Sequence, residues 1–258
     1  MNTKQQKLEA FSRLLDVMDN LREKCPWDMK QTNESLRHLT IEETYELSDA
    51  ILKNDDVEIK KELGDVLLHL VFYARIGSEK NQFDIADVCN ALCDKLIYRH
   101  PHIYGDVKAD TAEQVKENWE QLKLKEGNKS VLSGVAKGTP SIVKALRMQE
   151  KAAQVGFDWP TPTEVWAKVD EELAELKEEF EVNPDSEKTE KEFGDYLFSL
   201  VNLARKYNIN PDDALEKTNQ KFIERFQYIE EKAKKLDKKL TEMTLEEMDV
   251  YWNEAKKK

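Results

Sequence analysis

The chain has 258 residues, 40% apolar and 36% charged, with few glycines and prolines, a composition typical of a helix-rich protein of one or two domains. Its formal net charge of −12 disfavours binding to nucleic acids and to anionic membranes, because both need a basic protein surface. It has no apolar run near the roughly 20 residues that span a bilayer, and its three cysteines suit a reducing compartment, so we expect a cytoplasmic protein.

The first half of the chain is predicted to form three long helices. Apolar residues at helical spacing predict a helix over about 7–24. Thr32 or Asn33 can cap a second helix, which carries the motif Glu42-Glu43-Thr44-Tyr45-Glu46. A third helix follows an acidic turn and carries Glu62-Leu63-Gly64-Asp65 at the start of an apolar run.

Residues 126–140 are predicted to connect two modules, 1–125 and 141–258. They hold three of the eight glycines together with serines and a proline, which is loop composition. The second module begins with a helical pattern that breaks at 156–160 and continues in a helix capped near Thr163. No strand pattern competes, so the predicted fold is all-α.

The carboxylate motifs of the first half recur in the second, as Glu171-Glu172-Leu173-Ala174-Glu175 and Glu192-Phe193-Gly194-Asp195. Both halves also end with a Lys-x-x-x-Arg pair and a tryptophan, at Lys95, Arg99 and Trp119 in the first and at Lys221, Arg225 and Trp252 in the second. A repeat of this extent predicts two tandem helical-bundle modules.

Each pair of carboxylates places like charges on one helix face. Glu172 and Glu175 lie three residues apart, as do Glu192 and Asp195. The second pair opens an apolar helix that we expect to be buried, so its carboxylates are partly desolvated and repel their neighbours. A cation is therefore expected between them. No histidine falls in the second-half motifs, and an all-oxygen donor set suits Mg²⁺, with Mn²⁺ as the alternative.

A phosphate-bearing substrate is the natural partner of such a site, because Mg²⁺ typically bridges a few carboxylates to substrate phosphates. Lys168 shares a helix face with Glu172, and Lys191, Lys221 and Arg225 can add contacts to phosphate oxygens. Taken alone, a Glu-x-x-Glu pair is more often a solvated helix face. Two repeated copies beside apolar helices favour the functional interpretation.

The chain resembles the MazG family of nucleoside triphosphate pyrophosphohydrolases over nearly its whole length. Besides the carboxylate motifs, the resemblance rests on Cys25-Pro26-Trp27-Asp28, Gln31-Thr32, Arg99-His100-Pro101-His102 and the segment 151–159. It implies an all-α fold of helical bundles, a homodimer, and Mg²⁺-dependent cleavage of NTPs and dNTPs to the monophosphate and pyrophosphate.

The resemblance also implies roles for individual residues. The metal ligands carry over to Glu172, Glu175, Glu192 and Asp195, and the repeat supplies a second set at Glu43, Glu46, Glu62 and Asp65. The nucleotide contacts carry over to Lys168, Glu171, Lys188, Lys191, Lys221, Arg225 and Trp252. The catalytic candidates are Glu172, through the metal, and Glu171, which would take the proton of the attacking water. Trp252 would line the base pocket, where a flat aromatic contact tolerates any base and suits broad specificity.

The two halves differ in their cationic residues. Lys168 aligns with Leu39 and Lys188 with Glu58, so the first half offers fewer groups to a polyphosphate. We therefore expect the second half to be the main catalytic site, and the first half to be structural, regulatory or weakly active.

Two alternatives come from other classes of protein. The first is a non-catalytic helical dimer that senses a nucleotide or alarmone; a degenerate copy of this kind is expected to lose some cationic residues, whereas Lys168, Lys221 and Arg225 are all present. The second is a structural coiled coil, which predicts sustained heptads with neutral seam positions. The Asp and Glu residues within the apolar helices contradict it.

Overall fold

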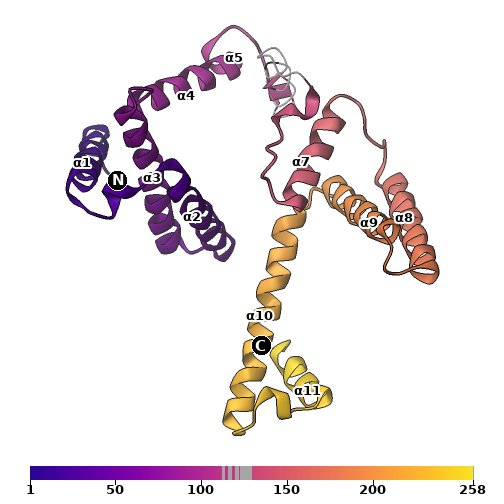
Figure 1. The fold of residues 1–258 in the computed structure, drawn as a ribbon. Coiled ribbons are helices and arrows are strands. Elements are labelled where there is room, and N and C mark those ends of the chain that lie inside the picture. The colour runs from indigo at the N-terminus through magenta and orange to yellow at the C-terminus, as the bar shows by residue number, and fades with distance from the viewer. Residues whose placement is uncertain (112–113, 116–117, 120–121, 123–129, 258) are drawn as a thin grey trace. The chain divides into compact units, whose positions relative to one another are not determined.

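The computed structural model describes residues 1–111, 114–115, 118–119, 122 and 130–257. The described residues form helices and turns without a β-strand, so the predicted all-α fold is confirmed (Figure 1). The chain divides into two compact units, Met1–Trp119 and Glu120–Lys258. The predicted linker 126–140 falls in the second unit, and its residues 126–129 lie outside the described part. No helix of the described residues is both long and apolar enough to cross a membrane.

The longer helices of the first unit begin at side-chain caps. They are α1 (Lys4–Lys24), the 3-10 turn η1 (Asp28–Lys30), α2 (Asn33–Lys53), α3 (Asp56–Glu79), α4 (Ile85–Arg99) and α5 (Pro101–Tyr104). Thr32, one of the two predicted caps, accepts a hydrogen bond from the Ser35 backbone N–H at the start of α2. Asn54 ends α2 in a left-handed conformation with φ of 54°, which asparagine tolerates, and Asp55 then caps α3.

The core of the first unit lies between α1, α2 and α3. Met18, Leu36 and Phe72, one from each helix, are at most 2% exposed and pack together. Helix α4, by contrast, contains no buried residue.

The second unit repeats the pairing of long helices. It contains the 3-10 turn η2 (Val131–Gly134), α7 (Ser141–Gln154), α8 (Pro162–Val182), α9 (Glu187–Lys206), α10 (Pro211–Lys235), the 3-10 turn η3 (Leu240–Glu242) and α11 (Leu245–Ala255). Helix α8 packs along α9, α7 packs against α9, and α11 packs on α10 (Figure 1).

The predicted break between α7 and α8 is present, but the cap of α8 is Thr161 and not Thr163. The break contains Gly156, whose φ of 86° suits a residue without a Cβ. The Thr161 backbone N–H donates to Glu164 Oε2 at 3.0 Å, and Pro162 fits the first helical position because it needs no amide hydrogen there.

The loop before α8 is tied to the end of α9 by ion pairs. The Arg205 guanidinium donates to both carboxylate oxygens of Asp158, and Lys206 Nζ lies 2.7 Å from Asp158 Oδ2. Arg205 also donates to the buried side-chain oxygen of Asn202. These contacts hold the start of α8 against the end of α9 and so help to fix the pair that carries the second-half carboxylates.

Candidate metal and nucleotide site

Helices α8 and α9 position the carboxylates of the second unit. A short turn joins the two helices, and Ser186 caps α9 by accepting the Thr189 backbone N–H at 3.1 Å. The spacing of three residues places Glu192 and Asp195 on one face of α9, opposite Glu172 on α8.

Three of the four predicted metal ligands lie together. Glu172, Glu192 and Asp195 each offer a carboxylate oxygen, and these oxygens lie within 4.8 Å of one another. Glu172 is only 7% exposed, whereas Asp195 is exposed. The fourth, Glu175, is exposed and outside this group, so its role stays a prediction. An all-carboxylate group that is buried on one side fits a hard divalent cation.

Lys168 contacts this group directly. Its Nζ lies 2.6 Å from Glu172 Oε1 and 2.9 Å from Glu171 Oε1. The hydrogen bond to Glu172, followed by that to Glu171, raises the pKa of Lys168 above its usual value. The lysine therefore stays protonated and partly neutralises the carboxylates.

Lys188 and Lys191 begin α9 but do not contact the gathered carboxylates. Lys188 pairs with Glu179, and this hydrogen bond is the main cause that raises its pKa. Lys191 Nζ lies 3.1 Å from Glu187 Oε1, in a pair whose two side chains are mostly exposed. Both lysines sit within a turn or so of Glu192, and the negative charge of Glu192 also contributes to the raised pKa of Lys188.

The remaining nucleotide-contact candidates lie on α10 and α11. The guanidinium carbon of Arg225 is 5.5 Å from the centre of the Trp252 ring, within the range of a cation–π contact. Phe222, which the sequence patterns did not single out, forms an edge-type ring contact with Trp252 at 5.2 Å between centroids. The sequence feature that could have indicated Phe222 as a site residue is its place about one turn before Arg225 on the same helix. The structure thus places the predicted second-half residues on two pairs of helices, α8 with α9 and α10 with α11.

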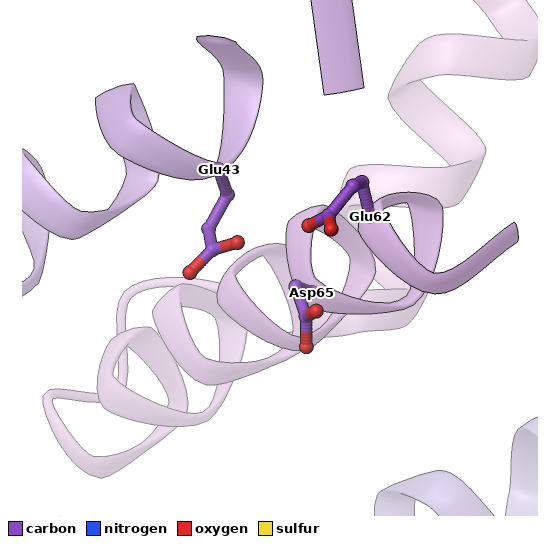
Figure 2. A group of neighbouring side chains, drawn as sticks. All are labelled: Glu43, Glu62 and Asp65. Atoms are coloured by element: carbon purple, nitrogen blue, oxygen red, sulfur yellow. The ribbon is translucent and has the colours of Figure 1, made fainter. Parts of the chain in front are cut away.

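The first unit contains the corresponding carboxylate group on α2 and α3. Oxygens of Glu43, Glu62 and Asp65 lie within 4.8 Å of one another, and Figure 2 shows the three carboxylates directed toward a common space. Burial, and then the negative charges of Asp65, Glu46 and Glu62, raise the pKa of Glu43. Glu46 itself is exposed and outside the group.

The cations around this first group differ from those of the second. Leu39 occupies the position of Lys168 and packs against the core cluster. The ammonium group comes instead from Lys61 on α3, whose Nζ lies 2.7 Å from Glu62 Oε1 and 3.6 Å from Glu58 Oε2.

A family model described as the MazG nucleotide pyrophosphohydrolase domain matches the chain twice, over residues 31–104 and 161–229. These matches contain both carboxylate groups. The chain is 45% identical over 251 residues to the nucleoside triphosphate pyrophosphohydrolase/pyrophosphatase MazG of Thermotoga maritima, covering 95% of each chain. It is 38% identical to the nucleoside triphosphate pyrophosphohydrolase of Escherichia coli K12, covering 97% of this chain and 98% of that protein.

Proposed function

The chain belongs to the MazG nucleotide pyrophosphohydrolase family, and we propose that it cleaves NTPs and dNTPs to the monophosphate and pyrophosphate in its second unit. The two family matches and the near full-length relatives make it a nucleoside triphosphate pyrophosphatase. The placement of Lys168 against Glu172, within a group of three carboxylates, supports assignment of the reaction to the second unit.

A divalent cation is part of the proposal. Glu172, Glu192 and Asp195 would hold Mg²⁺, with Mn²⁺ as the alternative and Glu175 as the predicted fourth ligand. Such an ion, when bound, neutralises phosphate oxygens and lowers the pKa of a bound water.

The cationic and aromatic side chains would bind the substrate. Lys168 would move from Glu172 to contact phosphate oxygens. Lys188 and Lys191 would contact these oxygens from the start of α9. Lys221 and Arg225 add further positive charge, and Trp252 offers a ring face that tolerates any base. Both groups of residues must reach one triphosphate, within a chain or between the two copies of a dimer.

Glu171 is the proposed general base. It lies beside Glu172 but outside the carboxylate group, and the hydrogen bond from Lys168 holds its side chain. As water attacks and the bond between the α- and β-phosphates breaks, the proton of the water passes to the Glu171 carboxylate.

Product analysis tests the reaction. The full-length protein is incubated with a panel of NTPs and dNTPs, with Mg²⁺ or with a chelator. We expect monophosphate and pyrophosphate from every base, only with the metal. Orthophosphate with diphosphate would overturn the reaction, and nucleotide binding without turnover would favour the regulatory sensor instead.

The internal repeat supplies a matched pair of variants that tests which of the two units carries out the reaction. Glu172→Gln is expected to reduce the rate of pyrophosphate release by about a hundredfold or more, because it removes a ligand that acts on the transition state. Glu43→Gln, the same change in the first unit, should leave most of the rate. The reverse result would place the reaction in the first unit.

We also propose a homodimer. Helix α4 has no buried residue and displays Val88, Leu92 and Leu96, and α10 displays Leu215 and Ile223 in the same part of the repeat. Exposed apolar stripes of this kind mark interaction surfaces, and their spacing of four residues on α4 and of eight on α10 suits packing against another helix. Because both units display exposed apolar residues on this helix, a second copy of the chain is the occupant that fits both.

A further inference from the structure

Three aromatic rings gather where α11 packs on α10, and one of them is largely open to water. The rings of Phe222 and Trp252 are inclined at 61°, with their centroids 5.2 Å apart. The ring of Phe226, one turn further along α10, lies nearly parallel to that of Phe222 at 6.1 Å between centroids. Phe222 is 57% exposed. A group of large rings at the surface is typical of a site that binds a ligand or a partner.

Trp252 is the most enclosed of the three rings. The guanidinium of Arg225 lies over it, and the indole packs against the buried cluster that contains Ile229. Trp252 is partly buried, whereas more than half of Phe222 is exposed. Of the three rings, Phe222 therefore leaves the most room for a flat ligand.

Positive charge beside Phe222 suits a nucleotide. Lys221 and Arg225, the proposed phosphate contacts of α10, stand directly before it and three residues after it. Residues three apart are neighbours on a helix surface, so the Phe222 ring and the Arg225 guanidinium lie on adjoining parts of α10. Bases stack on aromatic side chains, and Lys and Arg bind phosphate oxygens, so both ends of a nucleotide find a partner here.

The first unit has the cations without this ring. Its Lys-x-x-x-Arg pair and its tryptophan are present, but Leu96 aligns with Phe222 and His100 aligns with Phe226. Leu96 belongs to the exposed apolar stripe of α4, and its branched alkyl chain offers a base no flat face. At these two positions the repeat places phenylalanine only in the unit to which we assign the reaction.

We infer that Phe222 is the ring on which the nucleobase stacks in the second unit, with Trp252 lining the pocket beside it. This role rests on the proposed nucleotide site of the second unit and adds a residue that distinguishes one base from another. Stacking grows with the overlap of the rings. Phe222 should therefore contribute more to the binding of a purine, which has two fused rings, than to the binding of a pyrimidine.

Equilibrium binding of uncleaved nucleotides to the full-length protein with Mg²⁺ tests this role. The probes are adenosine and cytidine triphosphate analogues with a methylene group between the α- and β-phosphates. Phe222→Leu inserts the first-unit residue and keeps an apolar side chain for folding and association. We expect it to raise Kd about tenfold for the adenosine analogue and about threefold for the cytidine analogue, the order of loss when a base loses its aromatic partner.

Two further variants and a probe without a base are the controls. Phe222→Tyr keeps the ring and should retain the wild-type Kd for both analogues. Phe180→Leu removes an exposed phenylalanine near the end of α8 and should also leave Kd unchanged. Inorganic tripolyphosphate carries the phosphates alone and should bind the wild type and Phe222→Leu equally.

Steady-state kinetics should show a raised KM and an unchanged kcat in Phe222→Leu, because stacking holds the base equally before and during the reaction. The role of Phe222 is wrong if the adenosine analogue binds this variant as tightly as the wild type, or if tripolyphosphate loses affinity to the same extent. A changed mass in light scattering would assign Phe222 to association instead. Base-dependent binding to a wild type that cleaves no triphosphate would overturn the proposed reaction and leave the role of Phe222 standing.

Discussion

Lys168 is held between Glu171 and Glu172, and this contact is what most clearly distinguishes the second carboxylate group from the first. The lysine neutralises the group before a substrate arrives and then becomes available to phosphate. A residue with both roles is expected to matter more for the rate than for folding.

We predict that Lys168→Ala lowers kcat/KM for an NTP about a hundredfold, because a cation beside the developing charge is lost. Pyrophosphate release at several substrate concentrations measures the change. Lys177→Ala, which removes an exposed lysine from the same helix, is the control. Equal losses of kcat/KM in both variants would show that removal of any lysine from α8 lowers the rate, and would contradict a specific role for Lys168.

The negative charge of Glu79 stabilises the first unit in a pH-dependent way. Arg22 donates to its two carboxylate oxygens at 2.8 and 2.9 Å, and this contact lowers the pKa of Glu79 from its usual 4.5. The stabilisation is therefore present above about pH 4.5 and is lost as the pH falls through the lower pKa of the folded protein.

We predict that Glu79→Gln destabilises the protein by about 1 kcal/mol at pH 7, after allowance for solvent screening. The difference from the wild type should shrink as the pH falls below 4.5, because the wild-type carboxylate then becomes neutral too. Thermal unfolding at a series of pH values checks this. A difference that stays constant down to pH 3 would contradict the role of the charge.

At the scale of the element, the start of α9 determines where its two carboxylates lie. The Ser186 cap fixes the first turn, and Thr189, which is 3% exposed, donates from its hydroxyl to the Asn183 carbonyl. Glu192 and Asp195 follow within two turns, so fraying of this end would displace two ligands together.

We predict that Ser186→Ala costs about 1 kcal/mol of stability and raises the Mg²⁺ concentration needed for half-maximal activity. Thr3→Ala removes the same kind of cap from α1 in the first unit and is the control. It should reduce stability to a similar extent without changing the metal requirement. A shift of the metal requirement in both variants would indicate a general loss of structure.

At the scale of the whole molecule, the uncovered stripes on α4 and α10 predict association. The double variant Leu92→Glu and Ile223→Glu places a charge on each stripe and should prevent helix packing, because a buried unpaired carboxylate is costly. Light scattering is expected to give about 60 kDa, twice the chain mass of 30.1 kDa, for the wild type and 30.1 kDa for the variant.

Val182→Glu, at an exposed apolar position at the end of α8, should leave the dimer intact. A wild-type protein of 30.1 kDa would contradict the proposed homodimer.

Much of the architecture could be predicted from local patterns. The apolar periodicity predicted the long helices, and repetition of the Glu-Glu-x-x-Glu and Glu-x-Gly-Asp motifs predicted two related modules. The cap of α8 was misplaced by two residues, although Pro162 at the first helical position and the contact of Thr161 with Glu164 both favour Thr161.

The sequence by itself determined the helical fold, the repeat and the helix faces that carry the carboxylates, because all three follow from spacing along the chain. Only the tertiary structure decided that Glu172, Glu192 and Asp195 gather while Glu175 stays apart, and that Lys168 pairs with Glu172. It alone placed Arg225 over Trp252. These features depend on how helices pack and which way side chains turn, and residue spacing does not fix either.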